Sequence, residues 1–373
     1  MIAVRGRKVL TAAGERAGAW VVLDGDRIAD VATTPPRSAR PVDLGAVDLV
    51  PGLVDVHSDC LEMKARPRLS MELPLAAALV ELDAEAAAWG ITTHFLCVCL
   101  EDDIAKYRSP DRARETVALV ERLRPDLLVD HRVHLRVDLT GDGLAAAAAL
   151  TESPALGMVS YMLHLPGFGQ FPDEATWRRY YTTVEAEGET AEDRLRRRMA
   201  RLDRVGEARA AVAELARRRG VSLASHDDDS VDAVRLAHGL GARISEFPVR
   251  AEAAAEARAL GMEVVMGAPN ARSGRSHHGN GSAREVLARG ALTVLASDYH
   301  PPSLLAAACA LADEGMCSWA EAIALVTTGP ARAAGLADRG RIEPGARADL
   351  VAVGRRSGLP AVAGTWVAGR QVR

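Results

Sequence analysis

The stretch from Val50 to Asp59 (VPGLVDVHSD) constrains the fold of this chain more than any other. Its apolar residues are typical of a strand buried on both faces, as in a parallel sheet, and the run ends at His57 and Asp59. Residues two apart in a strand point the same way, so both side chains can be directed at one point. Such a pair at the C-terminal end of a barrel strand would begin a metal site. The alternative is a strand-end histidine beside a helix-capping aspartate.

Strand-like and helical segments alternate from residue 50 to about residue 335. The expected strands are 50–57, 91–98, 131–138, 157–164, 221–226, 242–247, 262–268 and 292–297. The expected helices between most of them are 74–89, 111–123, 206–219, 231–239, 250–260 and 282–289. This interleaving predicts an α/β fold, a (β/α)8 TIM-type barrel over residues 50–339.

The two ends of the chain have a different pattern. Short strand-like runs fill residues 1–49 and 340–373, and Asp24-Gly25-Asp26 is typical of a hairpin turn. We expect one small β-sandwich built from both termini, with two unrelated hairpins as the alternative. The arginines in residues 184–205 favour a solvated helix face, and a lid or a subunit contact are the alternatives.

Composition excludes several classes of partner. A net charge of −4 and 4 % aromatic residues argue against nucleic-acid binding. No apolar run approaches the ~18 residues that a membrane span needs. The five cysteines include no C-x-x-C pair and no secretory leader precedes them, which indicates reduced thiols, with Cys97 and Cys99 in the core rather than on a metal. We expect a soluble cytoplasmic protein without membrane or nucleic-acid partners, while a homo-oligomer stays open.

Histidines and aspartates follow the ends of several expected strands. They are His57, Asp59, Asp138, His164, His226 and Asp298. The C-terminal ends of barrel strands all face one end of the barrel, so these six side chains should converge there. Buried together they need positive charge, which divalent cations supply. The pattern predicts a divalent metal site of two ions, and this ligand chemistry suits Zn, Mn, Fe, Co or Ni.

At this point the chain resembles the amidohydrolase superfamily and, within it, the diphosphatases of the carbon–phosphorus lyase pathway. The stretches that carry the resemblance are 51–62, Ser225-His226-Asp227-Asp228-Asp229, Ile244-Ser245-Glu246-Phe247-Pro248, Gly267-Ala268-Pro269-Asn270, Ser276-His277, Gly279-Asn280 and Ser297-Asp298-Tyr299. The resemblance implies a metal-dependent hydrolase that releases pyrophosphate from α-D-ribose 1-methylphosphonate 5-triphosphate or a related organophosphate. It covers nearly the whole chain.

The resemblance also implies roles for the six side chains. His57 and Asp59 correspond to ligands of one metal, and His164 and His226 to ligands of the other. Asp138 stands where a bridging carboxylate is expected, although the family more often has Glu there. Asp298 corresponds to the last-strand aspartate that binds metal and carries the proton of the attacking water, which makes it the candidate catalytic residue.

Further residues are expected around the metals. Asp227 or Asp228 should orient the imidazoles, with helix N-caps as the alternative. An anionic small-molecule substrate needs positive charge, because phosphate binds arginine forks and ammonium groups. The candidates for substrate binding are Lys64, Arg66, Arg68, Asn270, Arg272, Arg275, His277, His278 and His300.

Departures from the family pattern leave the substrate open. Leu163 stands where the family has an aspartate before the histidine, and Phe168-Gly169 replace a Gln-Arg pair. Together with Leu165 they indicate a more apolar pocket, which favours the alternative of an amidohydrolase or deacetylase acting on an amide, a cyclic amide or an N-acyl compound. A third hypothesis is a non-catalytic barrel that serves as a binding or scaffold protein.

Overall fold

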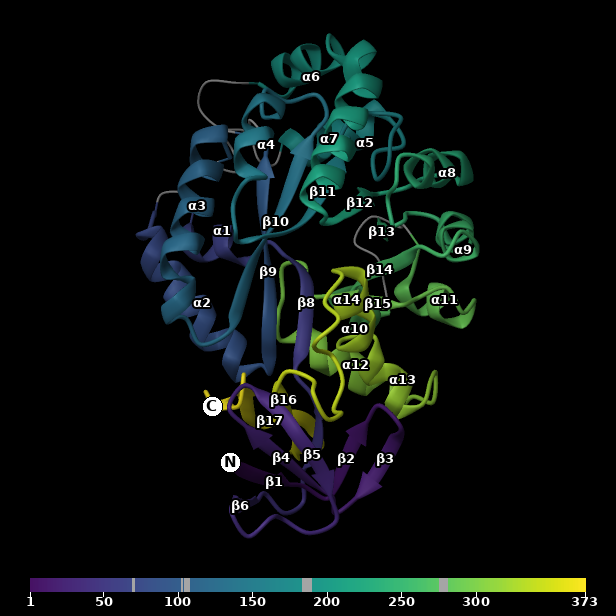
Figure 1. The fold of residues 1–373 in the computed structure, drawn as a ribbon. Helices are drawn as coiled ribbons and strands as arrows, with labels where there is room; N and C mark the ends of the chain where they lie inside the picture. Colours follow the sequence, from purple (N-terminus) through teal and green to yellow (C-terminus); the bar gives the residue numbers. More distant parts are fainter. Residues whose placement is uncertain (69–70, 102, 104–107, 183–189, 275–280) are drawn as a thin grey trace.

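Eight parallel strands form one sheet in the order β15-β14-β13-β12-β11-β10-β9-β8 in a computed structural model (Figure 1). The structure describes residues 1–373 except 69–70, 102, 104–107, 183–189 and 275–280. The strands are β8 (Leu53–Ser58), β9 (Ile91–Leu100), β10 (Asp130–Asp138), β11 (Leu156–Met162), β12 (Ser222–His226), β13 (Ile244–Glu246), β14 (Glu263–Gly267) and β15 (Val294–Ala296). The predicted (β/α)8 barrel is confirmed.

Backbone hydrogen bonds between the first and last strands close the barrel beside the candidate site. The Asp298 N–H donates to the His57 carbonyl at 2.9 Å, and the Asp59 N–H donates to the Asp298 carbonyl at 2.8 Å. Closure therefore brings the first-strand pair next to the last-strand aspartate, although 241 positions separate His57 from Asp298 in sequence.

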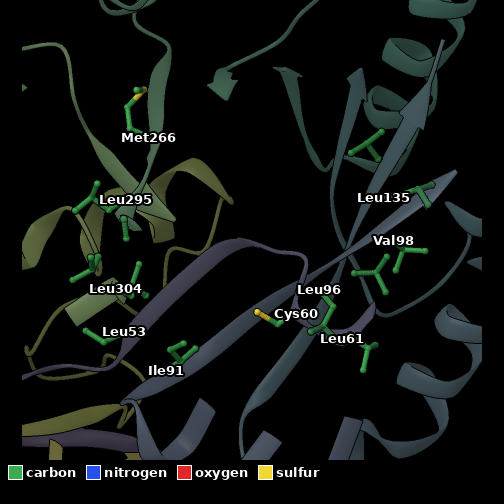
Figure 2. Close-up of a cluster of buried hydrophobic side chains, with 14 of the residues drawn as sticks. Leu53, Cys60, Leu61, Ile91, Leu96, Val98, Leu135, Met266, Leu295 and Leu304 are labelled. Carbon is green, nitrogen blue, oxygen red and sulfur yellow. The ribbon is translucent and has the colours of Figure 1, made fainter. Parts of the chain in front are cut away.

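Helices follow most of the barrel strands and surround the sheet (Figure 1). They are α1 (Cys60–Ala65), α2 (Leu75–Ala88), α3 (Pro110–Leu123), α4 (Leu144–Leu150), α5 (Glu174–Thr182), α6 (Ala191–Met199), α7 (Val205–Arg219), α8 (Val231–Gly239), α9 (Ala251–Ala259), α10 (Ala268–Ser273), α11 (Ala283–Ala288), α12 (Ser303–Asp313), α13 (Trp319–Ala324) and α14 (Thr328–Ala333). Their alanine-rich faces pack against aliphatic side chains of the strands, part of which Figure 2 shows around Ile91 and Leu53.

Strands from both termini form two further sheets, which lie together below the barrel in Figure 1. One has the order β5-β4-β1-β6 and the other β18-β17-β16-β7-β2-β3. The strands are β1 (Ile2–Arg5), β2 (Lys8–Thr11), β3 (Gly14–Ala17), β4 (Trp20–Asp24), β5 (Arg27–Ala32), β6 (Arg40–Asp43), β7 (Asp48–Pro51), β16 (Leu350–Arg356), β17 (Leu359–Val367) and β18 (Arg370–Gln371). A shared apolar cluster contains Val21 and Leu49 from the N-terminal part and Trp366 from the C-terminal part. The domain boundaries at 49/50 and 339/340 stay a prediction.

Two expectations about local structure change. The expected strand 50–57 is divided at Gly52, so Val50 and Pro51 belong to β7 of the terminal sheet and the barrel strand begins at Leu53. A Cβ at Gly52 would lie 2.2 Å from the Thr92 Oγ1 atom, so the close approach of β9 requires glycine there. In 184–205, α6 buries Arg194 and Arg198 and leaves other arginines outside, so only one of its faces is solvated.

No helix in the described part of the chain is long and apolar enough to cross a membrane. The five cysteines are not paired in disulfides in this structure.

Candidate active site

A cavity of about 560 Å³ opens at the C-terminal ends of the barrel strands. Five of the six predicted ligands line it: His57, Asp59, His164, His226 and Asp298. Asp227 lines it as well. The strands therefore bring these side chains to one site, as the positions of the strand ends predicted.

Glu246, the last residue of β13, lies beneath the histidines and is fully buried. Its carboxylate is 3.0 Å from His57 Nδ1 and 3.5 Å from His226 Nδ1. Burial opposes its ionisation, but His134 and His57 outweigh that cost and hold the pKa of Glu246 well below its usual range. A carboxylate at both Nδ1 atoms directs the Nε2 atoms of the two rings toward the cavity.

Arg136 lies between Asp59 and His226. Its Nη1 donates to both Asp59 oxygens at 3.1 and 3.2 Å, and its Nη2 lies 3.0 Å from His226 Nε2. Because a guanidinium only donates, His226 Nε2 is the acceptor and the ring proton is on Nδ1, facing Glu246. Burial opposes the charge on Asp59, but Arg136 and His57 lower the pKa of this carboxyl.

His164 and Asp227 form the other side of the site. His164 Nε2 is 3.6 Å from Asp227 Oδ2, and both atoms are buried without a hydrogen-bond partner in the described residues. The Trp177 indole donates to the His164 carbonyl at 3.0 Å, which connects α5 to the site. The N-cap of α8 is Ser230, so Asp227 and Asp228 are not the caps of that helix.

Backbone strain is concentrated at this end of the barrel. Asp227, Phe247 and Asp298 follow three barrel strands with φ of 58°, 51° and 57°. This left-handed region is uncommon for residues other than glycine and unusual for a bulky side chain such as Phe247. The Phe247 ring packs edge-on against His57, with ring centroids 4.8 Å apart, so the strained turn helps to fix that ring.

Asp138, the predicted bridging ligand, is not among the described residues that line the cavity. Its Oδ1 accepts the backbone and hydroxyl groups of Thr140, each at 2.7 Å, and its Oδ2 pairs with Arg198 at 3.0 Å. Among the described residues it belongs to none of the donor groups that could hold a metal. Asp138 Oδ2 is nevertheless buried without a hydrogen-bond partner among the described residues, so the role of Asp138 as a metal ligand stays a prediction.

The donor groups fit divalent cations. One group is His57, Asp59 and Asp298, and another is His164, His226 and Asp227; within each group one donor atom per residue lies within 4.8 Å of the others. Imidazole and carboxylate together suit Zn and neighbouring transition metals. The two buried, unpartnered atoms of His164 and Asp227 are the kind of donors that a cation satisfies.

The chemistry of Asp298 depends on its surroundings. Burial raises the pKa of this carboxyl, and the nearby Asp59 raises it further, whereas His57 and Arg136 oppose the rise. Without a bound cation, this carboxyl therefore accepts a proton more readily than a solvated one.

Arginines from outside the strands line the same cavity. Arg66, Arg108 and Arg112 join Arg136 there. Arg108 donates to both oxygens of Glu62, at 3.0 Å from its Nε, and to Glu101 at 3.0 Å, so its side chain is held in place. Four guanidinium groups therefore surround the donor groups.

The other predicted substrate-binding residues are distributed differently. Arg66 and Asn270 line the cavity. Lys64 donates to Glu85 at 2.7 Å, and neither it nor Arg68, Arg272 or His300 is among the described lining residues. Arg275, His277 and His278 lie outside the described residues. Leu165 and Phe168 pack with Trp177 in a cluster under α5 instead of lining the cavity.

Four site residues had no role in the sequence analysis: Glu246, Arg136, Arg108 and Arg112. Strand periodicity could have identified Arg136, because it is two residues before Asp138 in the same strand and points to the same side. Glu246 is a carboxylate at a strand end, which is the signal that selected the other ligands. Arg108 and Arg112 lie where α3 begins, and the sequence offers no comparable signal for them.

Comparisons with known proteins show the family of this chain. A model of the Amidohydrolase family matches residues 196–373. The chain is 35 % identical over 333 residues to the α-D-ribose 1-methylphosphonate 5-triphosphate diphosphatase of Escherichia coli (strain K12), which covers 87 % of this chain and 88 % of that protein.

Solved structures share the fold at low sequence identity. Ochratoxinase from A. niger superposes with a TM-score of 0.69 at 14 % identity, covering 99 % of this chain and 95 % of the other. N-acetyl-D-glucosamine-6-phosphate deacetylase from Mycobacterium smegmatis gives 0.61 at 17 % identity and covers 100 % of both chains. The chain belongs to the amidohydrolase family of metal-dependent hydrolases, together with the E. coli diphosphatase.

Proposed function

We propose that this hydrolase releases pyrophosphate from α-D-ribose 1-methylphosphonate 5-triphosphate or a related organophosphate. The observation that carries the proposal is the presence of Arg66, Arg108, Arg112 and Arg136 in one cavity with the metal-donor groups. Arginine forks match phosphate oxygens, and a triphosphate chain needs several of them. The relative with this activity adds support because the similarity extends over most of both chains.

Two divalent cations complete the proposed site, one held by His57, Asp59 and Asp298 and the other by His164, His226 and Asp227. When bound, such ions acidify a water molecule and polarise the phosphoryl group under attack. Zinc is our first expectation for the native ion.

The protein's own residues then position and protonate the reactants. Asp298 accepts the proton of the attacking water and returns it to the departing pyrophosphate, provided that it lies within hydrogen-bond reach. Arg108 and Arg112 bind phosphate oxygens and offset the charge that develops on the leaving group. Arg136 positions Asp59 and His226 in the metal-free site, and a cation on His226 Nε2 would replace the contact of Arg136 with that atom.

Hydrolysis of an amide, cyclic amide or N-acyl group is the second candidate. Leu61, Met63, Leu75, Val98 and Met266 line one part of the cavity, and this apolar surface suits an acyl or ring substituent better than a phosphate. The apolar lining residues belong to helices α1 and α2 and to strands β9 and β14. The sequence argument for an apolar pocket relied instead on leucines after β11, which pack in the cluster under α5.

The experiment compares Arg112→Gln with Arg114→Gln, because both arginines lie on α3 and only Arg112 lines the cavity. Arg114 pairs with Asp111 on the exposed face of the helix, so its replacement is the matched control. Loss of one charge-assisted contact of about 1.5–3 kcal/mol raises the KM for the triphosphate about 10- to 150-fold in Arg112→Gln. Pyrophosphate release is measured directly.

A KM for the triphosphate that is equal in both variants would contradict the proposal. Cleavage of N-acyl compounds without pyrophosphate release would favour the second candidate instead. The cytoplasmic location and a homo-oligomeric state stay predictions that this assay does not address.

A further inference from the structure

A second cavity lies at the opposite end of the barrel strands, and we propose that it binds a small phosphate-bearing anion. Its volume is about 680 Å³. Five arginines line it, from the start of β10, the adjoining 3-10 turn and the C-terminal segment: Arg124, Arg132, Arg339, Arg347 and Arg370. Among the described residues, two carboxylates line it with them, Glu121 and Asp130.

Three of these arginines share one carboxylate. Asp130 accepts from Arg124 at 2.7 Å, from Arg339 at 2.7 Å and from Arg132 at 3.1 Å. A single negative charge cannot neutralise three guanidinium groups, so the cavity keeps a positive field. Burial lowers the pKa of Arg132, Asp130 opposes this, and Arg339 and Arg124 lower the pKa further.

Other carboxylates near the cavity do not remove this excess. Arg339 also pairs with Asp338 at 2.9 Å, and Arg347 pairs with the buried Asp349 at 3.1 Å. These two aspartates contact Arg339 and Arg347 but are not among the described lining residues. When Asp338 and Asp349 are counted with Glu121 and Asp130, the five arginines still outnumber the four carboxylates.

Several guanidinium N–H groups remain available for a ligand. Arg132 and Arg347 each use Nε for a carboxylate, and in the described part of the chain their terminal nitrogens have no protein partner. Among the described residues, the Arg370 side chain donates through Nη2 alone, to the Leu127 carbonyl at 3.2 Å. Side-chain exposures of 22 % for Arg132 and 21 % for Arg347 make both accessible to a small molecule while limiting competition from water.

The chemistry favours a phosphate-bearing anion with several oxygens. Planar guanidinium forks from separate segments match the oxygens of a phosphoryl group, and a di- or triphosphate is long enough to reach more than one of them. Arg132 is six residues before Asp138 in β10, so this cavity lies about 20 Å from the active-site end of that strand. The inference therefore does not depend on the proposed substrate.

The experiment titrates the intact protein with pyrophosphate and, separately, with citrate, by calorimetry. Arg132→Gln combined with Arg347→Gln is compared with Arg217→Gln combined with Arg218→Gln, an exposed pair on α7 that contacts only Glu214 among the described residues. We expect the first double variant to lose one pyrophosphate site per chain, or at least tenfold in its affinity, with an unchanged KM for hydrolysis. The control pair keeps the site.

Equal pyrophosphate stoichiometry and affinity in the two double variants would overturn the proposal, and so would tighter binding of citrate than of pyrophosphate. A second measurement uses the wild-type protein, so its result does not depend on whether a variant folds. Phenylglyoxal modifies accessible arginines, and peptide mapping should show that pyrophosphate slows the labelling of Arg132 and Arg347 but not of Arg217. Labelling that is insensitive to pyrophosphate at both positions would also overturn it.

Discussion

Replacing Arg198 by methionine tests the buried ion network that joins α6 to the barrel. Arg198 donates to Glu101 and pairs with Asp138 at 3.0 Å, and all three side chains are at most 1 % exposed. Methionine fills a similar volume but removes the Arg198 charge from both carboxylates, while the contacts of Asp138 with Thr140 and of Glu101 with Arg108 remain. Breaking a buried ion pair from one side costs about 3–5 kcal/mol, because a desolvated charge loses its partner.

The measurable consequence is a lower melting temperature. The unfolding entropy is about 2.1 cal/mol/K per residue, so in a chain of 373 residues a loss of about 3–5 kcal/mol lowers the melting temperature by about 4–6 °C. Arg196→Met is the control, because Arg196 is on the same helix with a side chain that is 71 % exposed and pairs with Asp193. Its melting temperature should stay within about 1 °C of the wild type.

The double variant Arg198→Met with Asp138→Asn sharpens the test. Asparagine keeps an oxygen for Thr140 and carries no charge, so the double variant should recover at least about 1 kcal/mol relative to the sum of the single variants. Two results would show that Arg198 and Asp138 do not stabilise the protein jointly. One is a melting temperature of Arg198→Met equal to that of Arg196→Met, and the other is a loss of stability in the double variant equal to the sum of the single losses.

Three further predictions concern the active site and the lower cavity. Asp298→Asn should lower kcat for hydrolysis about 10²- to 10⁴-fold while substrate still binds, as a KM change of less than about threefold would show. Asp138→Asn should keep the divalent metal content of the wild type, measured by elemental analysis, whereas His164→Ala should lower it; equal loss in both would show that Asp138 is a ligand. Burial opposes ionisation of Asp130, but its three arginines hold the pKa of this carboxyl below its ordinary value in the folded protein. The ionised Asp130 therefore contributes its full stabilisation at any pH above the pKa of an unfolded aspartate, which is about 4. The stability advantage of the wild type over Asp130→Asn should therefore be constant from about pH 5 to 8 and shrink as pH falls below about 4, and an advantage that grows in acid would contradict the assignment.

The sequence was sufficient to predict where the barrel strands end and therefore where His57, His226 and Asp298 meet. Buried parallel strands leave a strong apolar pattern, and polar residues after such strands have one common location. The ion pair of Asp138 with Arg198 was not predictable in this way. The position of Asp138 at a strand end agrees with a metal ligand, but its partner Arg198 lies in a helix 60 positions later whose packing no local pattern reveals.

Buried arginines were the main feature that the sequence pattern did not predict. Arg194 and Arg198 are one helical turn apart and face the barrel, while Arg196 between them faces solvent, yet all three look alike in a charged segment. Which face is buried depends on the carboxylates that Asp103 and Glu101 present to them, and those residues belong to another part of the chain.

The interleaving of both termini in one sheet has a consequence for biosynthesis. Strand β7 pairs with β2 and with β16, and β16 begins at Leu350, about 300 residues after β7 ends at Pro51. At about 5–20 residues per second, a ribosome needs about 15–60 s to synthesise the intervening chain. During that interval the emerging protein has an open strand edge at β7, directly before the first barrel strand, so a nascent-chain chaperone should be needed most before β16 has been synthesised.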